Sequence, residues 1–156
     1  MRPMLYVILF VVICTLCGSI LAATPKPACD IDLMVETLRQ IENWDGRSLG
    51  AAGERGPWQF TPDVWHQYST LPFSCAEGKS NAEKTEQRRV AREVVFAISE
   101  RVKAARRTPD AYTVALIWGA GWSAYYYGQP HKPSAKKRDY AQRAENLYID
   151  LLKSHP

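Results

Sequence analysis

Apolar positions recur at helical spacing through most of this chain, which predicts a helical protein. Asp30 can cap a first helix, and Glu42 falls one position beyond the last apolar residue, where that helix should end. The apolar stripe of this helix consists of Leu33, Met34, Leu38 and Ile41.

Two Thr-Pro-Asp sequences predict further helix starts. Thr61 can cap one helix, with Pro62 in its first turn, and the sequence 108–110 precedes the apolar run "AYTVALIW". Between them, residues 81–106 read as one long charged helix whose charged side chains are expected to form a solvated face. Its buried stripe is expected to be Val90, Val94, Val95, Ile98 and Val102.

A last helix opens at Ser134 or at Asp139, and its apolar side carries Tyr140, Ala144, Leu147, Tyr148 and Leu151. The segments "GRSLGAAGERG", "STLPFSCAEGKS" and "YGQPHKPSAKKR" are expected to be loops, because glycine, proline and small polar residues gather there. No run alternates with a period of two over the length of a strand. The prediction is therefore an all-α single domain.

The N-terminus has the layout of a secretory signal peptide. A basic start and a long apolar run end in small residues, which predicts cleavage after Ala22 or Ala23 and an exported domain over residues 24–156. An uncleaved membrane anchor over residues 1–23 is the alternative, since the apolar run is nearly long enough to span a bilayer. No other segment is long and apolar enough. A periplasmic or extracellular location follows, and the oligomeric state stays open.

The net charge and the cysteines give no support for two classes of function, nucleic-acid binding and metal binding. Twenty Lys and Arg residues against sixteen Asp and Glu give a formal charge of +4, too small an excess to indicate nucleic-acid binding. Cys14 and Cys17 would leave with the signal peptide, so Cys29 and Cys75 are expected to form a disulfide in an oxidising compartment. Two cysteines without clustered histidines give no support for a metal site.

Glu42 is the first candidate for chemistry. It lies where an apolar helix meets a glycine-rich loop, close in sequence to Trp44 and Trp58. Burial against aromatic rings raises the pKa of a carboxyl group, and a carboxyl that stays protonated can act as a general acid. The alternative is an ordinary solvated glutamate at a helix end.

Two further segments surround this candidate with polar and aromatic groups. Glycines lead directly into Pro-Trp-Gln-Phe, where Gln59 carries an amide that both donates and accepts hydrogen bonds. The segment "ALIWGAGWSAYYYG" supplies Trp118, Trp122 and Tyr125, whose rings can stack on sugars. At least half of the aromatic rings in that segment are expected to belong to the core instead.

Together these segments resemble a known family. "IEN…GAAGERGPWQFTP", "ALIWGAGWSAYYYG" and "RDYAQRAENLY" are similar, in order, to motifs of the lysozyme-like lytic transglycosylases. The resemblance implies a compact helical domain with a groove for peptidoglycan glycan strands. It implies that Glu42 is the catalytic acid, that Gln59 and Trp58 lie in the groove, and that Tyr140 lies near Glu42. No metal or organic cofactor is implied.

Two departures leave alternatives open. Trp118-Gly119 stands where the family has Tyr-Asn, so an amide that contacts substrate is missing. Asp45 and Glu54 could supply a second carboxylate, which would allow hydrolysis instead of formation of an anhydro sugar. The alternatives to an enzyme are an inactive lysozyme-like module that binds cell-wall glycan and a small helical protein that binds another protein through exposed aromatic residues.

Overall fold

The computed structural model describes residues 26–43, 49–121 and 133–154, and it is all-α over these ranges, as the sequence predicts. The described segments contain no strand, only two isolated bridges that pair Arg55 with Leu49 and with Phe60. The helices are α2 (Ile31–Glu42), α3 (Pro62–Tyr68), the 3-10 helix η1 (Phe73–Glu77), α4 (Asn81–Ala104), α5 (Ala111–Ala120) and α7 (Ala135–Ser154).

The helix starts follow the predicted caps. The side chains of Asp30, Thr61 and Asp110 each accept a hydrogen bond from a backbone N–H in the first turn of α2, α3 and α5. α4 begins with a capping box, in which Ser80 and Glu83 each accept from the backbone N–H of the other. α7 begins at Ala135 and therefore after Ser134, the earlier of its two predicted starts.

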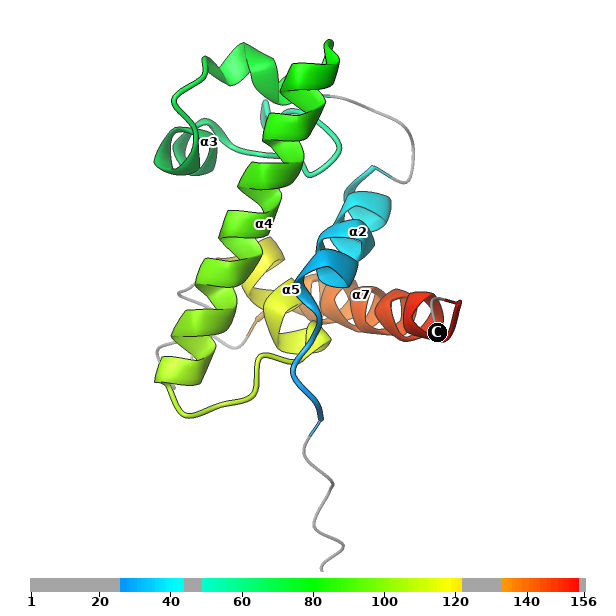
Figure 1. The fold of residues 1–156 in the computed structure, drawn as a ribbon. Helices are drawn as coiled ribbons and strands as arrows, with labels where there is room; N and C mark the ends of the chain where they lie inside the picture. Colours follow the sequence, from blue (N-terminus) through cyan, green and yellow to red (C-terminus); the bar gives the residue numbers. More distant parts are fainter. Residues whose placement is uncertain (1–25, 44–48, 122–132, 155–156) are drawn as a thin grey trace, which may run out of the picture.

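The helices form two groups joined by α4. In Figure 1, α3 and η1 lie at the start of α4, and α5 and α7 lie near its end, with α2 alongside. α5 packs most extensively on α7, and α2 contacts both α7 and α4. Fully buried residues of α2 and α4 and aromatic rings of the 49–65 segment form the core between the helices. They are Met34, Leu38, Val90, Val95, Phe60 and Trp65.

The glycine-rich segment has a defined conformation. The backbone N–H groups of Arg55 and Phe60 each donate to the carbonyl of the other, both at 2.9 Å, which closes a tight turn. Gly56 adopts a φ of 75°, and a side chain there would collide with the carbonyl oxygen of Ala76. The turn delivers Phe60 into the core, where its ring centroid lies 5.7 Å from that of Trp65.

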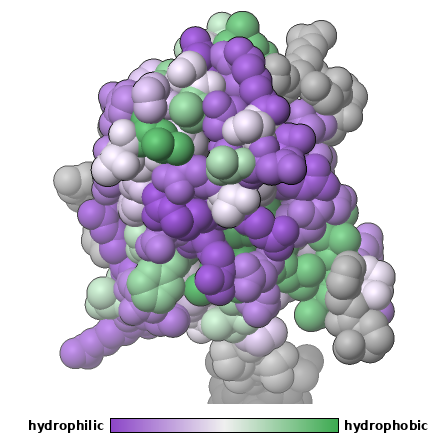
Figure 2. All heavy atoms as spheres, turned by 45° about the horizontal axis from the view of Figure 1, so that its top comes forward, coloured by the Kyte–Doolittle hydropathy of each residue, from purple (hydrophilic) through white to green (hydrophobic). Residues whose placement is uncertain are grey.

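The face shown in Figure 2, which is turned by 45° so that the top of Figure 1 comes forward, is largely hydrophilic, with hydrophobic residues in scattered spots among polar ones. Among the described residues, no helix is both long enough and apolar enough to cross a membrane. The predicted signal segment, residues 1–23, lies outside the described residues.

Two predictions need correction. The segment predicted as a loop before α4 contains η1, because Phe73 packs partly on the core and holds a single 3-10 turn there. The expected disulfide is wrong, since Cys29 and Cys75 are both free. Cys29 bonds through its backbone to Pro109, just after the end of α4, whereas Cys75 lies in η1, just before α4 starts. About 36 Å of helix separates these two ends, far beyond the ~7 Å between Cα atoms that a disulfide spans.

We expect both thiols to react with an alkylating reagent without prior reduction. Cys29 should react more slowly, because burial raises its pKa to about 11 and keeps the thiol protonated. Peptide mapping of the labelled, unreduced protein measures each site separately. A cross-linked peptide that contains both cysteines would contradict the arrangement.

Candidate functional site

Glu42 lies at the C-terminal end of α2, where it is partly buried against two other helices. The Tyr140 hydroxyl, from α7, donates a hydrogen bond of 2.7 Å to Glu42 Oε1. The Trp118 side chain, from α5, lies close enough to the same carboxyl group to lower its pKa. Side chains of α5 and α7 thus meet the carboxyl group at the end of α2, and Tyr140 fixes one of its oxygens. The expectation that Tyr140 lies near Glu42 is confirmed.

The surroundings raise the pKa of Glu42 above its ordinary value. Burial is the largest cause, and the negative charge of Glu54 adds to it, because both disfavour the ionised carboxylate. The hydrogen bond from Tyr140 and the polar side chain of Trp118 act in the opposite direction and lower the pKa. Burial and the nearby carboxylate also raise the pKa of Tyr140 well above its usual range, so its hydroxyl stays protonated and can donate.

Gly119 makes room for this contact. A side chain at Gly119 would place its Cβ only 3.0 Å from Cε1 of the Tyr140 ring, closer than van der Waals contact allows. A larger residue at position 119 would therefore require the Tyr140 ring to shift by a few tenths of an ångström. The glycine at position 119, where the resembled family has asparagine, is consistent with the close packing of α5 on α7 at this point.

Glu54 and Gln59 approach each other on the glycine-rich turn. Both side chains lie against Gly50, where any side chain would collide with the two of them. Glu54 Oε2 accepts a hydrogen bond of 2.9 Å from the Ala52 N–H, and Gln59 Nε2 donates one of 2.8 Å to the Gly56 carbonyl. Gln59 has a φ of 51°, which is unusual for a residue with a side chain. The second carboxylate candidate, Glu54, is close enough to Glu42 to influence its ionisation.

A pocket of about 350 Å³ begins at this turn. Gln59 and Trp118 line it together with Gly121 and side chains of α3 and α4. Trp118 is partly exposed, and its ring centroid lies 6.1 Å from that of Phe60 in the core. Gln59 and Trp118 are therefore brought together in one pocket, and Trp118 connects it to Glu42, which does not itself line the pocket.

Trp58 does not have the position expected of a sugar-binding ring. It is only 5% exposed, and its indole N–H donates a hydrogen bond of 2.9 Å to the Val35 carbonyl inside the protein. Packing against α2 gives this ring a structural role. Three other predicted site residues, Asp45, Trp122 and Tyr125, lie outside the described residues.

A second, larger pocket was not anticipated from the sequence. It has a volume of about 910 Å³ and lies between α2 and the first half of α4. The cations of α4 were expected to form an ordinary solvated face. The spacing of Lys84, Arg88 and Arg92, each four residues from the next, places them on one side of the helix but does not distinguish a pocket from open solvent.

Neither pocket offers an evident metal centre. Within the described ranges, no three His, Cys, Asp or Glu side chains gather in a way that could hold a metal ion. Comparisons with protein-family models, with curated proteins and with solved structures find no match for this chain.

We expect substitutions around Glu42 to move its pKa in opposite directions. Tyr140→Phe removes a hydrogen bond that favours the carboxylate, so the pKa of Glu42 should rise. Glu54→Gln removes a nearby negative charge, so the pKa should fall. Carbon-detected NMR titration of the Glu42 carboxyl measures both shifts. Glu100→Gln, a substitution at an exposed position of α4, is the control and should leave the pKa of Glu42 unchanged. Shifts of the same sign in Tyr140→Phe and Glu54→Gln would contradict this arrangement.

Proposed function

We propose that this protein is an exported enzyme that cleaves the β-1,4 bond between N-acetylmuramic acid and N-acetylglucosamine in peptidoglycan, with Glu42 as general acid. The observation that carries the proposal is the partly buried Glu42 carboxyl, whose pKa is raised and whose Oε1 accepts from Tyr140 at 2.7 Å. The order of the lytic-transglycosylase-like motifs supports it. So does the proximity of Glu42 to Tyr140, two residues that belong to separate motifs in the sequence.

The chemistry requires one carboxyl group that changes its protonation state twice. Burial keeps the proton on Glu42 to a higher pH than for a glutamate in water, so the acid form can protonate the glycosidic oxygen as the bond breaks. The resulting carboxylate then removes a proton from the attacking group. That group is the muramyl C6 hydroxyl in a lytic transglycosylase and a water molecule in a muramidase.

Tyr140 is the positioning residue in this mechanism. Its hydroxyl fixes one carboxyl oxygen and stabilises the carboxylate that forms after proton transfer, because its own proton stays in place. Gln59 and Trp118 line the adjacent pocket, where an amide and a partly exposed ring can bind sugar hydroxyls and the sugar face. Trp122 and Tyr125 belong to the same proposed surface by their place in the sequence. No cofactor is needed for this acid–base chemistry.

The second candidate function is a module that binds cell-wall glycan without cleaving it. Two observations favour it: the substrate-binding amide of the resembled family is replaced by Gly119, and both Tyr140 and Trp118 lower the pKa of Glu42 and so oppose its protonation. Such a module would use the same pocket but would leave the strand intact.

Glu42→Gln should abolish clearing of a peptidoglycan suspension. Loss of a general acid lowers the rate by at least about hundredfold, and the isosteric amide keeps the contact with Tyr140. Turbidity measurements on the variant and on the original protein test this. Glu100→Gln is the control and should clear as the original does. Equal clearing by Glu42→Gln would exclude Glu42 as the acid, and binding without clearing by the unsubstituted protein would favour the glycan-binding module.

The products distinguish the two possible reactions. We expect muropeptides that end in an anhydro sugar, one water lighter than a reducing end, because Glu42 alone can complete that reaction. Mass spectrometry of the released fragments measures this difference. Glu54→Gln should then leave the products unchanged. Reducing ends that disappear with Glu54→Gln would show instead that Glu54 acts as the base that activates water.

A further inference from the structure

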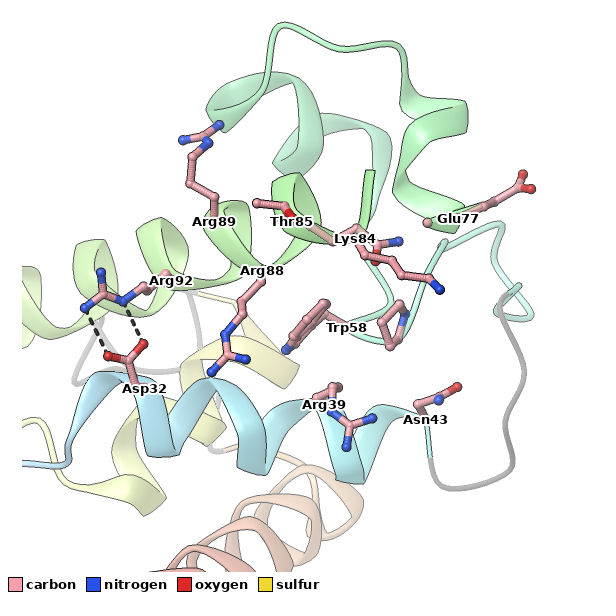
Figure 3. A pocket seen from close by; sticks show the side chains of 13 residues that line it. Asp32, Arg39, Asn43, Trp58, Glu77, Lys84, Thr85, Arg88, Arg89 and Arg92 are labelled. Carbon is pink, nitrogen blue, oxygen red and sulfur yellow. Dashed lines mark hydrogen bonds and ion pairs between the residues drawn. The ribbon is translucent and has the colours of Figure 1, made fainter. Parts of the chain in front are cut away.

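The pocket between α2 and α4 is rich in cations. Five of the residues that line its volume of about 910 Å³ are basic, against two acidic ones, Asp32 and Glu77. The basic residues are Arg39, Lys84, Arg88, Arg89 and Arg92. Figure 3 shows Arg88 and Lys84 extending from α4 toward the side of α2, with the Trp58 ring between them.

Three of these cations are already neutralised. Arg92 pairs with Asp32 across the pocket at 2.7 Å, the pair drawn with dashed lines in Figure 3. Arg39 pairs with Glu36 at 2.7 Å, and Arg89 pairs with Glu86 at 2.8 Å. The acidic Glu77 is likewise engaged, with Arg55 and Lys79.

Lys84 and Arg88 differ from the other cations. Neither side chain forms a hydrogen bond or an ion pair with any residue in the described part of the chain, although Arg88 is near enough to lower the pKa of Glu36. They are four residues apart on one face of α4, so their Cβ atoms are about 6 Å from each other. Like charges at this spacing destabilise a helix slightly, and the next cation along the same face is Arg92. A bound anion would remove that repulsion.

The pocket adjoins the candidate active site. Its lining includes Asn43, the residue that follows Glu42, and Arg39, one turn earlier on α2. The two sites therefore occupy neighbouring faces at the end of the same helix. A ligand that extends from Glu42 across the end of α2 reaches the cations of α4.

We propose that this pocket is an anion-binding site in which Lys84 and Arg88 bind carboxylates of the peptide stems of peptidoglycan. The inference rests on the proposed function, because a glycan strand at Glu42 brings its covalently attached peptides to the mouth of the pocket. Two cations on successive turns of one helix face can bind two carboxylates of the same peptide, and the Arg88 guanidinium can form two parallel hydrogen bonds to one of them. The alkyl stems of these side chains and the Pro57 ring give the peptide an apolar floor.

The test compares binding of intact peptidoglycan with binding of the same glycan after an amidase has removed its peptides. All variants carry Glu42→Gln, so that the polymer is not cut during pelleting. Lys84→Gln/Arg88→Gln should weaken binding to intact peptidoglycan by about tenfold, the effect of losing two exposed ion pairs. It should not change binding to the peptide-free glycan. Added salt should reduce the difference, since exposed charges are screened.

The control variant is Lys103→Gln/Lys153→Gln, which loses the same charge at exposed positions outside both pockets. It should bind both polymers as the parent does. Equal binding of intact peptidoglycan by the Lys84/Arg88 variant would overturn the inference, as would an equal loss on peptide-free glycan. A loss on intact peptidoglycan that vanishes once its phosphate-bearing polymers are removed would overturn it too, because the pocket would then bind phosphate.

A soluble stem peptide separates this inference from the proposed function. Titration of the peptide into the unsubstituted protein should shift NMR signals of residues around Lys84 and Arg88, and the double variant should lose these shifts. If the protein clears no peptidoglycan but still binds the peptide here, the proposed function fails and the inference stands. If it clears peptidoglycan but the peptide produces no shifts, the inference alone fails.

Discussion

The contact between Glu42 and Tyr140 is the interaction around which the rest of the site is arranged. A carboxyl group that is largely withdrawn from water needs a partner, and the partner comes from α7, 98 residues further along the chain. The contact brings α2, α5 and α7 together, and the absence of a side chain at Gly119 leaves room for the Tyr140 ring. The packing of α5 on α7 therefore also contributes to the burial and the hydrogen bond that shift the pKa of Glu42.

The sequence predicts the features of this protein that depend on neighbouring residues. Asp30, Thr61 and Asp110 cap their helices because the acceptor and the backbone donor lie within one turn. The cysteine pairing could not be predicted in the same way. It depends on where α4 carries the chain, and that helix places Cys29 and Cys75 at opposite ends.

Only part of the candidate site could be predicted from the sequence, because the rest of it depends on tertiary packing. The resemblance identified Glu42 and Tyr140 as neighbours, and the structure confirms the contact. Whether an aromatic ring faces solvent or the core is decided by tertiary packing, so the sequence could not show that Trp58 would bond to Val35 inside the protein. Nor could charge spacing alone show that Lys84 and Arg88 face a pocket and not open solvent. Trp58 connects the two findings, because it belongs to the core and also forms part of the wall of the basic pocket.

The backbone conformation of Gln59 lowers the stability of the folded protein. Its backbone has a φ of 51°, a conformation that costs a residue with a side chain roughly 1 kcal/mol compared with glycine. Glycines already occupy nearby positive-φ positions of the turn at Gly53 and Gly56, so a glycine at 59 would fit the backbone better. The chain instead keeps a strained residue whose amide lies against Glu54 and lines the pocket beside Trp118. The backbone conformation at position 59 thus costs folding free energy and fixes where this polar side chain lies in the pocket.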